Sequence, residues 1–187
     1  MKCSAFIATS VDGYIATPDG GVDWLDTAGK QDADLGEHED MGFNDYIAST
    51  DCMIMGRKCM EAIASFNLTD EQWPYRNTRI VVLSQTLREA PDNMKHRVEM
   101  YAGELPALLE RLENEGFKHA YVDGGTTLTS FLNLGLLNEI TLTRAPIILG
   151  GGIPLFGPAD KPIALEEAHA VAYANDFVQV KYKVRYV

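Results

Sequence analysis

The sequence is poor in cysteine and in basic residues, and both shortages narrow the classes of protein to which it can belong. Its three cysteines stand neither as an even number nor at C-x-x-C spacing, so neither a disulfide framework nor a cysteine zinc site is indicated. A reducing, cytoplasmic compartment fits this usage. The 16 Lys and Arg are outnumbered by 27 Asp and Glu, which gives a formal net charge of −11. Such a surface repels polyanions, and we expect neither nucleic acid nor an anionic membrane as a partner.

Long apolar runs and metal-binding patterns are missing as well. No stretch approaches the roughly 18 residues of a membrane span, and the N-terminus lacks the features of a signal peptide. The length suits one sizeable core, so we expect one domain over residues 1–187. The histidines show no metal-ligand spacing, and we expect no bound metal and four structural or solvent-facing rings: His38, His96, His119 and His169.

Strands and helices alternate along the chain. The period of the apolar residues predicts strands at 2–9, 51–55, 79–84, 97–102 and 118–123, and helices at 38–49, 57–65, 104–115 and 126–134. Later, 138–149 and 170–186 alternate as strands do, and the Gly/Pro-rich loop 150–162 joins them most simply as an antiparallel pair. We therefore predict an α/β fold with a mixed, mostly parallel central sheet, antiparallel C-terminal strands and helices on both faces.

Two strand-to-helix turns carry the clearest chemistry. At Gly56-Arg57-Lys58 a buried strand ends and a helix begins, so free helix N–H groups and two cations are expected together, a combination that suits a phosphate. Equally, Gly56 could relieve a tight turn beside solvated cations. At Gly124-Gly125 two adjacent glycines would let the backbone approach a ligand closely. Both turns are expected at the carboxyl edge of the sheet, where ligands of open α/β sheets bind, although neither is a Rossmann or P-loop motif.

Five motifs occur in an order that resembles one known superfamily. They are Ser10-Val11-Asp12-Gly13-Tyr14-Ile15-Ala16 with Gly20-Gly21-Val22-Asp23-Trp24-Leu25, then Met55-Gly56-Arg57-Lys58, Val82-Leu83-Ser84, Asp123-Gly124-Gly125, and the segment from Ala145-Pro146 to Phe156. Over nearly the whole chain they resemble the dihydrofolate-reductase-like superfamily. Within it, the chain is most similar to the reductase (C-terminal) domain of bacterial riboflavin biosynthesis enzymes, the RibD C-terminal group.

The resemblance implies a three-layer fold that binds NADPH. It would place the 2′-phosphate and adenine near Arg57, Lys58, Ser84 and Gln85. It would place the pyrophosphate against Gly56, Cys59, Gly125, Thr126, Thr127 and Leu128, and the nicotinamide by Ala8, Ile15 and Gly124. Leu83 and Val122 are further expected cofactor contacts. In this group a cis peptide often joins the two glycines that match Gly124 and Gly125. The implied loop over the site carries Trp24. The Pro146 strand and the loop 149–156 resemble the segment through which these proteins form homodimers.

The sequence says less about catalysis and substrate. Hydride transfer needs mainly alignment and the exclusion of water, which fits the lack of a His, Ser, Asp constellation. By resemblance, Asp40 falls near the acidic residue of classical dihydrofolate reductases, although a solvated acidic helix face is the simpler explanation. Aromatic residues in 65–77 could stack on a flat substrate or could simply cap the neighbouring helix.

Two departures from the family patterns bear on the substrate. Thr78 stands where folate enzymes keep an arginine, and Met60-Glu61-Ala62-Ile63 replaces the stretch that holds a phosphoribosyl group in riboflavin-pathway enzymes. We therefore expect an NADPH-dependent reductase of a small heterocyclic or carbonyl substrate, resembling 5-amino-6-(5-phosphoribosylamino)uracil reductase. The alternatives are a dihydrofolate reductase and an NADPH-binding protein without turnover.

Overall fold

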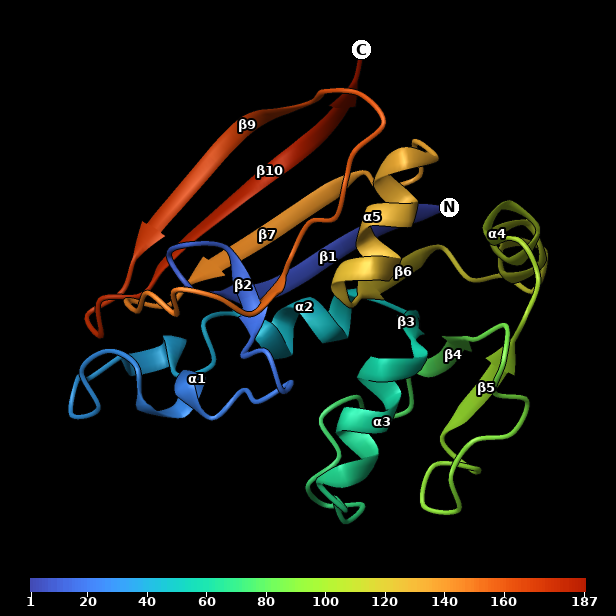
Figure 1. Ribbon diagram of the computed structural model, residues 1–187, viewed down its shortest axis with the longest axis horizontal. Coiled ribbons are helices and arrows are strands. Elements are labelled where there is room, and N and C mark those ends of the chain that lie inside the picture. Colours follow the sequence, from blue (N-terminus) through green and yellow to red (C-terminus); the bar gives the residue numbers. More distant parts are fainter.

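The protein is built around one eight-stranded sheet, flanked by helices (Figure 1). A computed structural model describes the backbone of residues 1–187 and every side chain except that of His38. The strands follow the order β5-β4-β3-β6-β1-β7-β10-β9, and β2 and β8 form a separate two-stranded ladder. The elements are β1 (Lys2–Thr9), β2 (Tyr14–Ala16), α1 (Trp24–Thr27), η1 (Gly36–His38), α2 (Phe43–Ser49), β3 (Cys52–Gly56), α3 (Arg57–Ser65), β4 (Arg79–Leu83), β5 (Val98–Tyr101), α4 (Leu105–Asn114), β6 (His119–Asp123), α5 (Gly125–Asn133), β7 (Glu139–Arg144), β8 (Ile153–Pro154), β9 (Ile163–Ala172) and β10 (Val178–Tyr186).

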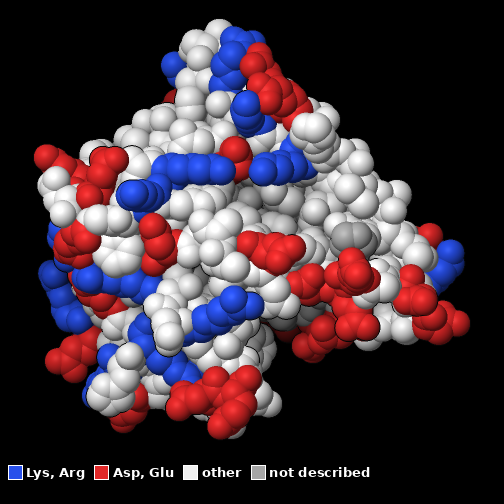
Figure 2. Space-filling view, turned by 180° about the vertical axis from the view of Figure 1, so that it is seen from behind, with Lys and Arg blue, Asp and Glu red and all other residues white. Residues whose placement is uncertain are grey.

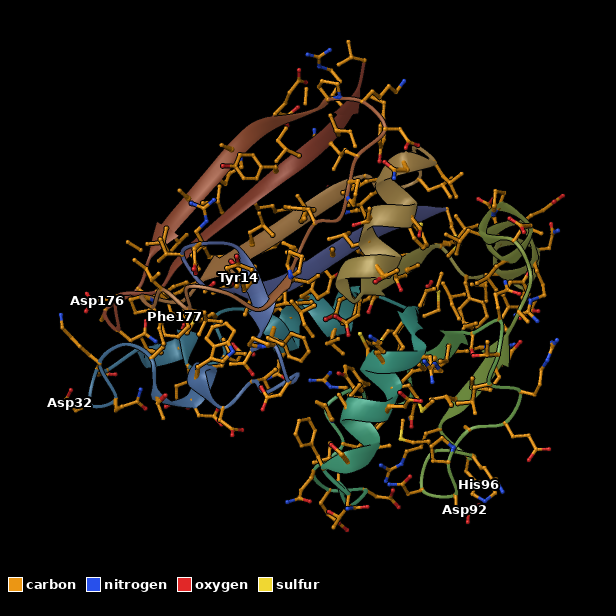
Figure 3. The ribbon with its side chains drawn as sticks, viewed as in Figure 1. Tyr14, Asp32, Asp92, His96, Asp176 and Phe177 are labelled. Carbon is orange, nitrogen blue, oxygen red and sulfur yellow. The ribbon has the colours of Figure 1, made fainter. Side chains whose placement is uncertain are left out.

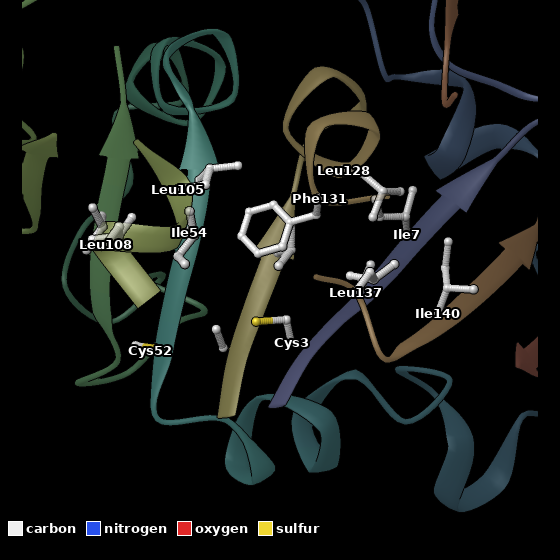
Figure 4. Close-up of a cluster of buried hydrophobic side chains, with 14 of the residues drawn as sticks. Cys3, Ile7, Cys52, Ile54, Leu105, Leu108, Leu128, Phe131, Leu137 and Ile140 are labelled. Atoms are coloured by element: carbon white, nitrogen blue, oxygen red, sulfur yellow. The ribbon is translucent and has the colours of Figure 1, made fainter. Parts of the chain in front are cut away.

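The six strands from β5 to β7 are parallel, and their side chains alternate between two apolar clusters. Ile54 of β3 points to the cluster that α4 and α5 cover, where Phe131 is fully buried (Figure 4). Met53 and Met55, its neighbours along the strand, point to the opposite cluster with Ile47 of α2 and Met60 of α3. The predicted fold class, a mixed sheet with helices on both faces, is confirmed.

The C-terminal part differs from its prediction in the bounds and the number of its strands. The strand predicted at 138–149 ends at Arg144 as β7. β10 pairs antiparallel with β7, as expected, but the alternating stretch 170–186 is not one strand. A turn at 173–177 divides it into β9 and β10, and Asp176 takes a left-handed φ of 70° there. The prediction failed because apolar residues keep alternating across the turn, so that Asn175-Asp176 is the only local signal of a break.

The segment between β1 and β3 also contains less helix than predicted. Helix α2 covers Phe43–Ser49 instead of 38–49, because Gly42 adopts a left-handed φ of 84° immediately before it. The irregular stretch 10–36 contains β2 and the short α1. Within the part of the chain that the structure describes, no helix has the length and apolar character needed to span a bilayer.

Candidate active site

The carboxyl ends of the neighbouring strands β3 and β6 lie between the N-termini of α3 and α5. The two helices lie on opposite faces of the sheet, since Met60 and Phe131 belong to different apolar clusters. Among the described side chains none caps either N-terminus. The first N–H groups of both helices therefore remain available at one edge, together with the positive ends of two helix dipoles.

The three glycines of these turns are held close to protein atoms. A Cβ on Gly124 would lie 2.5 Å from Sγ of Cys59, and one on Gly125 would lie 2.8 Å from the carbonyl oxygen of Leu155. A Cβ on Gly56 would lie 3.0 Å from Oγ1 of Thr127. The glycines thus bring the two turns and the loop before β9 together. The predicted close approach of this backbone to a ligand stays a prediction.

The backbone at Gly124 has a left-handed φ of 95° and a ψ of 137°, which favours glycine. The expected cis bond between Gly124 and Gly125 is wrong, because every peptide bond in the described chain is trans. The positive φ of Gly124 turns the chain from β6 into α5 without it.

Cations stand beside the first of these turns. Arg57 is the first residue of α3 and pairs with Glu61 one turn later, with 3.1 Å between Nη1 and Oε1. Lys58 is exposed and has no ion-pair partner among the described residues. Next to them, at the end of β4, the hydroxyl oxygen of Ser84 accepts the N–H groups of Thr86 and Leu87. The edge therefore offers one free cation, one paired cation and free helix N–H groups to an anion.

Other residues predicted to contact the cofactor are spread over the same edge. Leu83 and Ile15 are half-buried, Gln85 and Thr126 are exposed, and Thr127 is buried beside Gly56. Leu128 and Val122 are fully buried in the apolar core, and the N–H of Leu128 donates to the carbonyl of Gly124 at 2.8 Å. The side chains of Leu128 and Val122 are apolar and buried, so a bound cofactor would contact the backbone of these two residues rather than their side chains.

A hollow of about 490 Å³ lies beside this edge, over β1 and β7. Its floor is apolar and includes Phe6, Ala8, Phe43 and Phe177. Segment 25–43 forms one wall, and Asn175 of the turn between β9 and β10 lies at another side. The predicted nicotinamide contact Ala8 belongs to this lining, which connects the two halves of the predicted site.

Asp40 lines the hollow, but its carboxylate is already engaged. Its oxygens accept the backbone N–H groups of Gly42 at 3.0 Å and of Asn44 at 2.7 Å. These bonds lower the pKa of Asp40, the bond from Asn44 contributing most. Asp40 lies before α2 rather than within it, and it stabilises the start of that helix as an anion. Its proposed catalytic role stays a prediction.

Trp24 is packed inside the protein. It is 7% exposed and contacts a small cluster with Ala28, Ala145 and Phe177. Its indole Nε1 is buried and has no hydrogen-bond partner among the described atoms. The side chain thus forms part of the support beneath segment 25–43, and its predicted closing over the site stays a prediction.

Asp123 was missed as a candidate from the sequence. It ends β6 immediately before Gly124, and Oη of Tyr121 lies 3.5 Å from its Oδ1. Desolvation raises the pKa of this carboxyl to about 6. The nearby thiol of Cys59 has a pKa raised to about 12, chiefly by burial, and stays protonated. The edge therefore contains a carboxyl group that exchanges its proton near neutral pH.

The aromatic segment 65–77 was ambiguous in the sequence, and the structure favours the structural explanation. Trp73 and Tyr75 contact each other edge to face at 5.2 Å and pack on the cluster beneath α3. The guanidinium of Arg97 lies 4.4 Å from the Trp73 ring. Trp73 lines a second hollow that residues preceding β4 and β5 form, at the amino edge of the sheet.

The three histidines whose side chains the structure describes lie on separate parts of the chain, away from this site. His119 bonds Ser4 Oγ through Nε2 at 2.7 Å and the carbonyl of Ser49 through Nδ1 at 2.8 Å, so its role is structural as expected. His96 and His169 are exposed, and the side chain of His38 lies outside the described residues.

Comparison with known proteins identifies the family to which the chain is similar. The model of the RibD C-terminal domain matches residues 2–179. The chain is similar to the uncharacterized protein YwjB of Bacillus subtilis (strain 168), at 29% identity, with 83% of this chain and 82% of that protein covered. It is also similar to the crystal structure of a putative riboflavin biosynthesis protein from Shewanella sp. PV-4, with a TM-score of 0.88, 34% identity and full coverage of both chains.

A more distant structure shares the fold. The riboflavin biosynthesis reductase Rib7 of Saccharomyces cerevisiae has a TM-score of 0.64 and 12% identity, with 98% of this chain and 90% of that chain covered. At this identity the likeness shows the fold only. The family model spans nearly all of the sequence. The chain belongs to the RibD C-terminal domain family.

Proposed function

We propose that the protein is an NADPH-dependent reductase of a small heterocyclic or carbonyl substrate. The observation that carries the proposal is the pair of uncapped helix N-termini that meet at one sheet edge, next to Arg57 and Lys58 and beside an apolar hollow. Membership of the RibD C-terminal family supports a reductase. Two structures of similar fold are described as a riboflavin biosynthesis reductase and as a deaminase and 5-amino-6-(5-phosphoribosylamino)uracil reductase.

The residues present fit a dinucleotide phosphate. The free N–H groups of α3 and α5 would hold the pyrophosphate, and Lys58 with Arg57 would meet the 2′-phosphate. When bound, NADPH supplies the hydride. Ala8 and Ile15 form the apolar border between this edge and the hollow, and an apolar border of this kind excludes water from the transfer.

Asp123 is the group best placed to move a proton at this edge. Its pKa of about 6 lets it hold a proton in part of the population near neutral pH, as a general acid requires. Tyr121 donates to the carbonyl of Phe6 at 3.1 Å and so fixes the strand end against β1.

The test is a titration of the purified protein with NADPH and with NADH, followed by cofactor fluorescence. We expect saturable binding and at least a tenfold preference for NADPH, since only NADPH carries the 2′-phosphate that the cations would meet. Equally weak binding of both would contradict the proposal. NADPH oxidation across a panel of pterins, pyrimidines, quinones and aldehydes then separates a reductase from a protein that binds without turnover.

We further propose a homodimer. Ile148 and Phe156, in the segment before β9, are 72% and 44% exposed, and Leu165 of β9 is also exposed. Leu155, in contrast, is buried within the chain. Light scattering should give twice the 20.6 kDa chain mass, and a monomer would remove this proposal.

A further inference from the structure

We infer that the hollow beside the cofactor edge selects a substrate that is neutral or cationic and carries no phosphate. This inference rests on the proposed function, because it assigns the hollow to the molecule that receives the hydride. It concerns the charge and shape of that molecule rather than the cofactor.

The wall of the hollow carries a concentration of negative charge. Between residues 19 and 45 the sequence contains nine Asp or Glu and a single Lys or Arg, Lys30. Asp26, Glu39 and Asp40 from this segment line the hollow itself. Figure 2 shows acidic side chains gathered on the right, where this segment lies when the molecule is seen from behind. An anion entering the hollow would approach several carboxylates from one side.

Lys30, the one cation among the described residues of the lining, is already paired. Nζ of Lys30 lies 3.3 Å from the carboxylate of Asp176, in the turn between β9 and β10. Figure 3 shows Asp176 and Asp32 at the same end of the molecule as Phe177. Among the described side chains that line the hollow, none offers an unpaired positive charge to a phosphate.

The floor adds a preference for a flat, apolar body. Phe6, Phe43 and Phe177 supply aromatic surface, and Phe6 and Phe43 meet edge to face with their ring centroids 5.7 Å apart. Thr143 Oγ1 also lines the hollow and accepts a hydrogen bond from Gln179 at 2.9 Å. Aromatic faces with carboxylates around them suit a ring bearing N–H donors. In this assignment the anionic part of the cofactor binds at the N-termini of α3 and α5, and an uncharged or positively charged ring of the substrate binds in the hollow.

The experiment uses three probes of matched shape: benzamidine as cation, benzamide as neutral molecule and benzoate as anion. Binding of each to the full chain is measured by ligand-observed NMR, with competition by the other two. We expect benzamidine and benzamide to bind and benzoate to bind at least tenfold more weakly. Binding of benzoate as tight as that of benzamide, or no binding of any probe, would overturn the inference.

Two variants test whether the carboxylates of the hollow cause the preference for a cationic probe. Asp26→Asn with Glu39→Gln should reduce the preference for benzamidine over benzoate severalfold, whereas Asp92→Asn should leave it unchanged. Asp92 lies near His96 at the other end of the molecule (Figure 3). Asp40 is left intact because it supports the start of α2. An equal effect of both changes would mean that overall charge, not the hollow, sets the preference, and would overturn the inference.

The same samples are titrated with NADPH. Tight NADPH binding with a reversed charge order contradicts only the present inference. The expected charge order without NADPH binding contradicts the proposed function and leaves a pocket of the stated selectivity. A second version of the test compares uridine with uridine 5′-phosphate, and we expect the phosphate to weaken binding at least tenfold.

Discussion

The two halves of the carboxyl edge of this sheet have opposite chemistry. Around β3 and β6, two helix N-termini and the cations Arg57 and Lys58 offer positive potential. Around β1 and β7, Asp26, Glu39 and Asp40 surround an aromatic floor. Within one acidic chain, a phosphate-bearing cofactor and a substrate can therefore be kept apart by charge alone. The comparison shows that net charge describes the surface poorly near a site.

The largest effect should come from Gly124 on the cofactor side. Gly124→Ala adds a Cβ 2.5 Å from Sγ of Cys59 at a φ of 95°, and we expect a loss of about 3 to 4 kcal/mol in the free energy of unfolding. Gly13→Ala is the matched control, because Gly13 has a φ of 88° and open space around it. It should lose only about 1 kcal/mol in urea unfolding. Partial rescue of Gly124→Ala by Cys59→Ala would confirm the contact, and equal losses in both glycine variants would refute it.

Removing the cations should sharpen the contrast between the two halves. Arg57→Ala with Lys58→Ala should weaken NADPH binding by about 2 kcal/mol, roughly thirtyfold, and affect NADH much less. Arg185→Ala, in a distant ion pair with Glu166, is the control. Calorimetric titration measures all three proteins. Loss of NADH and NADPH affinity by the same factor would show that these side chains do not bind the 2′-phosphate.

The burial of Asp123 should make the free energy of unfolding depend on pH. Its pKa is raised from 3.8 to about 6, so the ionised form is disfavoured in the folded protein. The free-energy cost of ionising this buried carboxyl in the folded protein is therefore absent below about pH 4. It appears as the pH rises and is complete above about pH 6. Asp123→Asn should gain about 1 to 2 kcal/mol of stability at pH 8 relative to the wild type, and this gain should vanish near pH 3.5. A gain that is the same at both pH values would contradict the assignment.

The smallest effect concerns Asp40 on the substrate side. Asp40→Ala removes the acceptor for the N–H groups of Gly42 and Asn44 and should cost about 1 kcal/mol. Since the pKa of Asp40 is lowered in the folded state, this contribution exists at neutral pH and is lost as the pH falls through the folded-state pKa. Urea unfolding at pH 7 and pH 3 checks both points. A large loss of turnover with unchanged stability would instead indicate a catalytic role.

The sequence predicted most of the parallel half because buried strands and amphipathic helices leave clear periods there. Helix α3 was predicted at its observed bounds, and the Gly56-Arg57 turn was placed correctly. The failures lie where tertiary contacts decide. The turn at Asn175-Asp176 interrupts an unbroken apolar alternation, and Gly42 shortens α2. Asp123 was overlooked because burial raises its pKa, and the burial of a side chain at a strand end depends on the tertiary structure.

The most direct test of the division between the two halves is hydrogen exchange of the protein with and without NADPH. We expect NADPH to slow exchange in the first turns of α3 and α5, at residues 57–60 and 125–128, and to leave residues 26–42 nearly unchanged. Slower exchange confined to residues 26–42, with α3 and α5 unaffected, would contradict the assignment of the cofactor to the cationic half.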